Sequence, residues 1–220
     1  MTKEFVIFDF DNTIVNSLDY WYKVMDKESF KYWGSKILKD FKTKRRGLGN
    51  REIAELFLEL TNIKDIDVED VMSYWYERMT MYYTKRVKLI KGVVNYIKHL
   101  KDSGYKIILS SATNADLLTV VVKHLGLDKY FDSIYTEQIL GVSKKYPEYY
   151  SLLLQKLNTT PDKVFVFEDS VASITSANNL NIDTCAVYSK YNKNRLDRLE
   201  SMSKMIIKNY TDVRLKELGL

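Results

Sequence analysis

The chain has 220 residues, of which 45% are hydrophobic and 29% charged, so it has the composition of a globular protein and not of a disordered or fibrous one. Its formal net charge of +5 comes from Lys and Arg spread along the chain without a polybasic block, which gives no reason to expect nucleic acid as a partner. No apolar stretch reaches the ~18–20 residues of a membrane span, and Cys185 is the only cysteine, so we expect a cytoplasmic protein without membrane contact or an internal disulfide.

Short apolar runs alternate with helical stretches along most of the chain. This alternation predicts an α/β fold with a doubly wound parallel sheet flanked by helices. We expect strands at residues 4–9, 105–110, 133–136, 163–167, 184–188 and 204–207. We expect helices between them at residues 92–102, 115–125, 147–157 and 170–180.

One long segment breaks this alternation directly after the first strand. Its pattern predicts helices at 18–41, 51–60 and 68–83, with two glycines in the turn 45–50. We therefore expect an all-helical domain at residues 17–85, inserted into a core domain made of residues 1–16 and 86–220.

Two carboxylates follow the first strand. Asp9 and Asp11 are two residues apart, so in an extended backbone both side chains face one point beyond the strand end. In open α/β sheets ligands bind at that point. Paired carboxylates are tolerated best beside a hard cation, which indicates Mg²⁺. The same pattern is also compatible with a turn or a helix cap.

A later strand ends in the same way. The apolar run 164–167 leads into Glu168 and Asp169. Asp169 would supply a third carboxylate to a metal site, with Glu168 binding through water or supporting its neighbours. The alternative is that both acids only favour the start of the next helix.

Two further segments place polar groups at strand or helix ends. Ser111, Ala112, Thr113 and Asn114 follow the strand at 105–110, where hydroxyls and amides can bind an anion or simply cap a helix. Lys144 and Lys145 precede a helix that begins at Pro147. A lysine there could neutralise a phosphoryl group, although many lysine pairs are only solvated.

Taken in order, these segments resemble the motifs of the haloacid dehalogenase superfamily, in the phosphoglycolate phosphatase and beta-phosphoglucomutase-like branch with a helical cap after the first strand. The first motif stands at 9–13 as Asp-x-Asp-x-Thr, and the second falls on Ser111. Lys144 matches the third-motif lysine because Pro147 occupies the second proline position, while Lys145 replaces the first proline and leaves open which lysine acts. The fourth motif is the acidic pair 168–169.

The resemblance implies a Mg²⁺-dependent phosphatase that acts on a small phosphorylated metabolite through an aspartyl-phosphate intermediate. Asp9 would be the nucleophile and Asp11 the general acid and base. Ser111 and Lys144 would hold the transferring oxygens. The predicted metal ligands are Asp9, the backbone carbonyl of Asp11, and Asp169, with Glu168 as a further or supporting ligand.

The inserted cap gives the few indications of substrate. In related proteins a cap loop contacts the leaving group, and Arg45, Arg46 and Arg51 flank the corresponding turn here. A solvated basic turn is the alternative. The full set of predicted substrate-binding residues is Thr13, Ala112, Asn114, Arg45, Arg46 and Arg51. We expect a monomer or weak dimer.

Other activities remain possible within this resemblance. A sugar-phosphate mutase is the main alternative, although Trp21 stands where such mutases carry a cap histidine, and the run after Ser111 lacks their lysine. Phosphonatases use a cap lysine, and nothing in the spacing distinguishes one among Lys36, Lys39, Lys42 and Lys44. Dehalogenases lack the second aspartate. A non-catalytic binding protein on the same fold is the alternative from another class.

Overall fold

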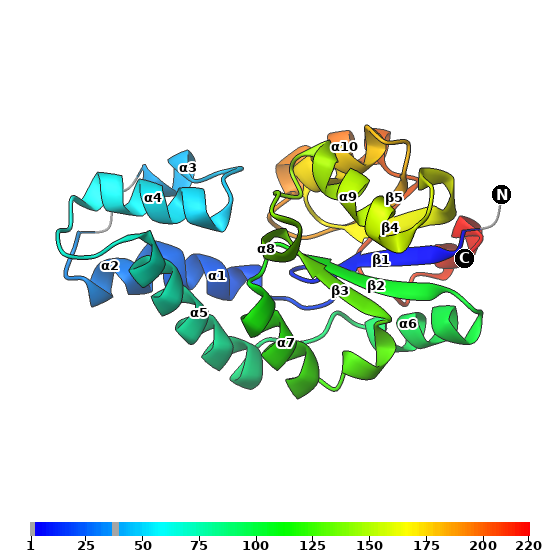
Figure 1. The fold of residues 1–220 in the computed structure, drawn as a ribbon, viewed down its shortest axis with the longest axis horizontal. Helices are drawn as coiled ribbons and strands as arrows, with labels where there is room; N and C mark the ends of the chain where they lie inside the picture. Colours follow the sequence, from blue (N-terminus) through cyan, green and yellow to red (C-terminus); the bar gives the residue numbers. More distant parts are fainter. Residues whose placement is uncertain (1–2, 37–39) are drawn as a thin grey trace. The chain divides into compact units, whose positions relative to one another are not determined.

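The computed structural model describes residues 3–36 and 40–220 and divides into two compact units (Figure 1). Unit 1 takes in Met1–Asn16 and Lys88–Leu220, and unit 2 takes in Ser17–Val87. The second junction lies two residues later than the expected 85/86 boundary, because the amides of Arg86 and Val87 both donate to the carbonyl of Tyr82 and so attach these two residues to the end of the preceding helix.

Unit 1 contains a six-stranded parallel sheet in the order β3-β2-β1-β4-β5-β6. Its strands are β1 (Phe5–Asp9), β2 (Lys106–Ser111), β3 (Ser133–Thr136), β4 (Val164–Glu168), β5 (Asp183–Val187) and β6 (Met205–Ile207). The chain leaves β1 for β2 and β3 on one side and then returns to β4 on the other. The predicted α/β class with a parallel sheet is therefore confirmed.

Helices cover both faces of this sheet. In Figure 1, α6 (Val93–Asp102) and α7 (Ala115–His124) lie on one face, and α9 (Pro147–Leu157) and α10 (Val171–Asn178) lie on the other. The short helices α8 (Glu137–Leu140) and α11 (Leu196–Met202) were not expected from the sequence. Four to seven residues span too few turns for helical periodicity to be recognised.

Both faces of the central strands are packed. Ile7 and Ile108 face a cluster that includes Tyr149 and Tyr150 of α9. On the opposite face, the rings of Phe8 and Phe167 are stacked at 4.8 Å between centroids. Strands buried on both faces explain the near-continuous apolar runs in the sequence. This packing fixes the carboxyl ends of β1, β2 and β4.

Helices are the only regular secondary structure among the described residues of unit 2. It contains α1 (Leu18–Lys23), a π-helix (Val24–Glu28), α2 (Ser29–Tyr32), α3 (Phe41–Lys44), α4 (Asn50–Thr61) and α5 (Val68–Lys85). The single helix expected at 18–41 is wrong over 33–36, because the chain leaves the helix after Tyr32 and Gly34 adopts a φ of 65°. Residues 37–39, which include the predicted cap lysine Lys39, lie outside the described residues.

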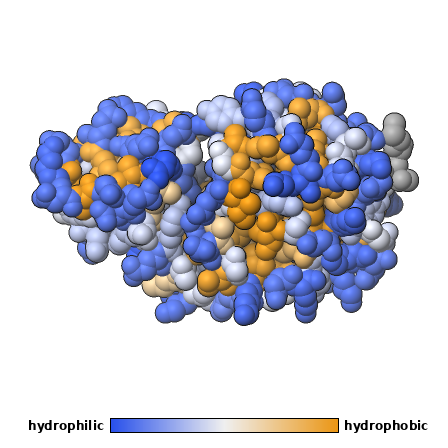
Figure 2. All heavy atoms as spheres, in the orientation of Figure 1, coloured by the Kyte–Doolittle hydropathy of each residue, from blue (hydrophilic) through white to orange (hydrophobic). Residues whose placement is uncertain are grey.

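Among the residues described, no helix combines the length and the apolar composition that a bilayer crossing needs. On the face shown in Figure 2, hydrophilic and hydrophobic residues both reach the surface of each unit. Cys185 is a buried free thiol, as expected for a small core residue.

A buried ion pair joins two segments of unit 2. Arg45 donates through Nε to Oδ1 of Asp26 at 2.7 Å and through Nη2 to Oδ2 at 2.9 Å. The guanidinium carbon also lies 4.0 Å from the centre of the Tyr22 ring. Both charged side chains are less than one-tenth exposed. Arg45, which the sequence suggested as a substrate ligand, therefore has a structural partner inside its own unit.

Replacing Asp26 by alanine leaves the Arg45 charge buried without its partner, and we expect this to destabilise unit 2 by about 3–5 kcal/mol. All three tryptophans lie in unit 2, so fluorescence during urea unfolding reports on that unit. Glu69→Ala is the matched control, because it removes an exposed pair with Arg51 and should cost at most about 1 kcal/mol. Equal effects of the two variants would contradict this structural role.

Candidate active site

The carboxyl end of β1 carries a buried ion pair between residues far apart in the sequence. Nζ of Lys144 lies 2.7 Å from Oδ1 of Asp9 and 2.7 Å from Oε2 of Glu168. It also donates to the carbonyl of Ser110 at 3.1 Å. The ends of β1, β2 and β4 thus meet around one ammonium group.

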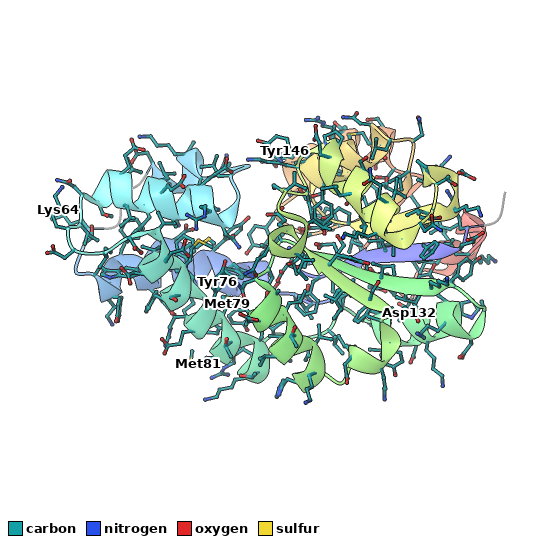
Figure 3. All side chains as sticks on the ribbon, in the orientation of Figure 1. Lys64, Tyr76, Met79, Met81, Asp132 and Tyr146 are labelled. Atoms are coloured by element: carbon teal, nitrogen blue, oxygen red, sulfur yellow. The ribbon has the colours of Figure 1, made fainter. Side chains whose placement is uncertain are left out.

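The structure distinguishes between the two candidate lysines. Lys144 is 3% exposed and enters this cluster, whereas Lys145 lies over the ring of Tyr146, 5.2 Å from its centre. Figure 3 shows Tyr146 where the chain enters α9. The carboxylate of Glu137 holds the lysine loop, because its Oε1 accepts from the Lys144 amide at 2.7 Å and from Ser143 Oγ at 2.8 Å.

The two acidic residues at the end of β4 have different hydrogen-bond partners. Oε1 of Glu168 accepts the backbone amides of Asp169 and Ser170, each at 3.0 Å, while Oε2 pairs with Lys144. The carbonyl of Asp169 accepts from Nδ2 of the buried Asn192 at 3.2 Å. Glu168 therefore organises the turn that carries Asp169.

The electrostatics of the cluster reflect buried like charges. Burial and the charge of Glu168 raise the pKa of Asp9 to about 8, and Lys144 opposes this shift only in part. Burial, then Asp9 and Glu168, raise the pKa of Asp169 well above its usual value. Burial alone would lower the pKa of Lys144, but the carboxylates of Asp9 and Glu168 raise it well above its usual value. One ammonium does not balance three carboxylates.

These residues fit a small divalent cation. Oxygens of Asp9, Glu168 and Asp169 lie within 4.8 Å of one another, and carboxylate oxygens are the ligands that Mg²⁺ prefers. A cation would offset the repulsion that raises the pKa values of both aspartates. Because Glu168 already binds two amides and a lysine, Asp9 and Asp169 are the better placed direct ligands.

The loop after β2 brings hydroxyl groups to the same edge. Oγ of Ser111 accepts from the Thr113 amide at 3.0 Å, and Oγ1 of Thr113 donates to Oδ2 of Asp11 at 2.6 Å. Ala112 between them is exposed. Asn114 caps α7 instead: its Oδ1 accepts the amides of Asp116 and Leu117. The sequence suggested Ser or Thr for such a cap, and the predicted substrate contact of Asn114 stays a prediction.

The turn after β1 uses buried polar residues. Asn12 adopts a φ of 59°, a left-handed conformation that asparagine tolerates, and its amide donates to the carbonyl of Val15. Thr13 is fully buried, and its carbonyl accepts from the Tyr210 hydroxyl at 3.0 Å. The Thr13 side chain is therefore enclosed in unit 1, and its predicted substrate contact stays a prediction.

The sequence of the chain matches that of a known protein family. The haloacid dehalogenase-like hydrolase profile matches residues 6–187, which includes all four motifs. The chain belongs to this family. It is accordingly an enzyme of the hydrolase class, and the resemblance seen in its motifs is confirmed.

Individual relatives of this haloacid dehalogenase-like hydrolase span most of its length. A phosphorylated carbohydrates phosphatase of Thermotoga maritima is 28% identical over 181 residues, which is 82% of each chain. A haloacid dehalogenase hydrolase structure from Entamoeba histolytica has a TM-score of 0.83 at 20% identity and covers 98% of this chain and 97% of its own. A beta-phosphoglucomutase structure from Clostridium difficile has a TM-score of 0.78 at 21% identity, with 99% and 96% covered. Both structures share the fold.

The predicted arginine ligands lie in unit 2. Arg46 is exposed, and Arg51 forms an exposed ion pair with Glu69. For these two and the buried Arg45, a substrate contact stays a prediction. Lys36, Lys42 and Lys44, which the sequence did not distinguish from one another, also lie in unit 2. Lys44 pairs with Asp40 at 3.2 Å.

Several residues that organise this hydrolase site were not expected from the sequence. Glu137 holds the Lys144 loop, and Asn192 supports Asp169. Gln138 accepts at Oε1 from Asn114 Nδ2 and from the Ala115 amide, both at 3.1 Å. None belongs to a motif run. The position of Thr113, two residues after Ser111 in a hydroxyl-rich segment, is the signal in the sequence that could have indicated its role.

Metal binding should depend on Asp169. We expect Asp169→Asn to weaken Mg²⁺ binding at least ~10-fold, because it would remove the negative charge of a predicted ligand. Titration calorimetry with Mg²⁺ alone measures this without any substrate. Lys145→Met is the control and should leave the affinity unchanged, since Lys145 lies outside the cluster. Wild-type affinity in Asp169→Asn would exclude this carboxylate as a ligand.

Proposed function

We propose that this hydrolase is a Mg²⁺-dependent phosphatase that cleaves a small phosphorylated metabolite through an aspartyl-phosphate on Asp9. The observation that carries the proposal is the buried contact of Lys144 with Asp9 and Glu168 at the ends of three parallel strands. A lysine ammonium beside the attacking carboxylate would stabilise the negative charge of a phosphoryl group during attack. The Thermotoga maritima relative, a phosphorylated carbohydrates phosphatase, supports a sugar phosphate as the substrate class.

The first step transfers the phosphoryl group to the enzyme. A carboxylate oxygen of Asp9 attacks phosphorus, and the electron pair of the breaking bond goes to the leaving oxygen. Asp11 gives its proton to that oxygen. Lys144 and the Ser111 hydroxyl bind the non-bridging oxygens, and each such donor contributes on the order of 3 kcal/mol to transition-state stabilisation.

The second step restores the enzyme. Asp11, now a carboxylate, takes a proton from a water molecule that attacks the phosphoryl group on Asp9. The bond between phosphorus and the Asp9 oxygen then breaks, and inorganic phosphate leaves. Asp11 is protonated again and ready for the next substrate.

The cation would be held by Asp9, the carbonyl of Asp11, and Asp169, with Glu168 in support. Bound Mg²⁺ supplies positive charge that offsets the repulsion between the Asp9 carboxylate and an anionic phosphoryl group. Glu168 keeps the turn of Asp169 in place through the two amides that it accepts. Lys144 screens Asp9 from Glu168.

The helical unit 2 is the proposed cap domain, and its residues argue against a mutase. Trp21, at the position of the mutase histidine, is 4% exposed and donates through Nε1 to the Tyr83 hydroxyl at 2.9 Å. It packs in its own unit and has no titratable group. The segment after Ser111 also lacks the mutase lysine. The likeness to a beta-phosphoglucomutase structure at 21% identity concerns the fold alone.

Asp9→Asn should abolish hydrolysis of 4-nitrophenyl phosphate, because the variant keeps the shape but loses the nucleophilic charge. We expect kcat to fall by at least ~10³-fold in a colorimetric assay with Mg²⁺. Activity close to wild type would exclude covalent catalysis by Asp9.

Asp11→Asn is the matched comparison to Asp9→Asn. A nitrophenyl leaving group needs little protonation, so the first step should survive while water activation fails. Intact-protein mass spectrometry should then detect a phosphorylated enzyme. A variant that never carries phosphate would show that Asp11 has a different role.

Product analysis separates hydrolase from mutase. With a hexose 1-phosphate and a catalytic amount of hexose bisphosphate, we expect free phosphate and free hexose. The Trp21 position offers no group that would let only a sugar hydroxyl reach the acid/base, so water should intercept the intermediate. Isomerised sugar phosphate in excess over free phosphate, measured by ³¹P NMR, would favour the mutase.

A further inference from the structure

Thr113 contacts the proposed acid/base directly. Its Oγ1 donates to Oδ2 of Asp11 over 2.6 Å and so joins the loop after β2 to the loop after β1. Thr113 is 2% exposed and Asp11 is half-buried, so the threonine end of this bond is shielded from water. A hydrogen bond that is shielded from water is electrostatically stronger than the same bond in water. The two side chains therefore hold each other in one geometry.

The surroundings of Thr113 leave its hydroxyl little freedom. Its amide donates to Ser111 Oγ at 3.0 Å, and the next residue, Asn114, caps α7. A β-branched side chain has few accessible χ1 rotamers. The hydroxyl position is thus set by the backbone on both sides, before any substrate binds.

We propose that Thr113 is a positioning residue for Asp11, whose carboxylate it orients for proton transfer to the leaving oxygen. This inference rests on the proposed phosphatase function. A hydroxyl carries one hydrogen, and Thr113 gives it to Asp11, so Thr113 acts on the acid/base and not on the phosphoryl group. Ser111 has the complementary role: its Oγ accepts from the Thr113 amide and can donate its own hydrogen to a phosphoryl oxygen.

The orientation of Asp11 matters in proportion to the basicity of the leaving oxygen. When the bond from phosphorus to that oxygen breaks, the electron pair stays on oxygen and the Asp11 proton moves onto it. A nitrophenolate leaves without much help, whereas phenolate, whose conjugate acid resembles tyrosine with a pKa of about 10, needs the proton. Loss of the Thr113 hydroxyl should therefore slow substrates with basic leaving groups most.

The test compares Thr113→Val with Thr113→Ser across a series of phosphate esters from 4-nitrophenyl to phenyl phosphate. The measured quantity is kcat/KM, which reports the step that cleaves the ester. We expect Thr113→Val to lose roughly 10- to 100-fold on phenyl phosphate and less than about 3-fold on 4-nitrophenyl phosphate. Thr113→Ser keeps the hydroxyl and should restore a leaving-group dependence close to wild type.

A double-mutant cycle with Asp11→Asn adds a second readout. If Thr113 acts through Asp11, the loss on phenyl phosphate in the double variant should equal that of Asp11→Asn alone. Thr119→Val is the control, because it removes an exposed hydroxyl that donates to the Ala115 carbonyl within α7, and it should leave kcat/KM unchanged for every ester.

Three outcomes would overturn the proposal. These are an equal loss across the whole ester series in Thr113→Val, additive losses in the cycle, and a Thr113→Ser variant as impaired as Thr113→Val. Each would mean that Thr113 only supports the loop. A wild-type enzyme that hydrolyses no ester of the series would instead contradict the proposed phosphatase function. The two failures are therefore distinguishable.

Discussion

The site depends on one constraint: a single ammonium group must stabilise several carboxylates in a dry environment. Lys144 contacts Asp9 and Glu168 at 2.7 Å each, yet burial and then the charge of Glu168 still raise the pKa of Asp9 to about 8. Buried charges that are only partly compensated cost stability, and proteins retain them mainly where they serve a function. The remaining negative charge suits a divalent cation, so the same imbalance that strains the fold favours a metal.

Lys144 can meet this demand only because distant segments hold it. Pro147 is the first residue of α9, where a missing amide hydrogen costs nothing. Tyr149 and Tyr150 pack α9 against the sheet. Glu137 fixes the lysine backbone from the other side. The long flexible side chain of Lys144 is therefore anchored at its base and ion-paired at its tip, which gives a point charge a defined position.

The sequence was enough to predict the parallel sheet, its six strand segments, and the polar residues at the ends of three of them. This succeeded because buried parallel strands leave strong apolar runs, and Asp9, Ser111 and Glu168 stand where the runs stop. Contacts such as Thr113 with Asp11, or Glu137 with the Lys144 amide, join residues through loops and a four-residue helix that have no periodicity. The break after Tyr32 and the Asp26–Arg45 pair were missed for the same reason.

The register of β2 shows how closely the chemistry follows from the sheet. Successive residues of a strand face opposite sides, so Ser110 directs its hydroxyl to Tyr149 of α9 at 2.9 Å, while Ser111 faces away from α9 and meets the Thr113 amide. A slip of one residue would exchange these two serines and move Thr113 away from Asp11. Pairing with β1 on one side and β3 on the other prevents this slip, since Asp9 is opposite Ser110 and Thr136 is opposite Ser111. Three hydroxyl residues within four positions can therefore contact three different groups, and an isolated loop of the same sequence could not hold them apart.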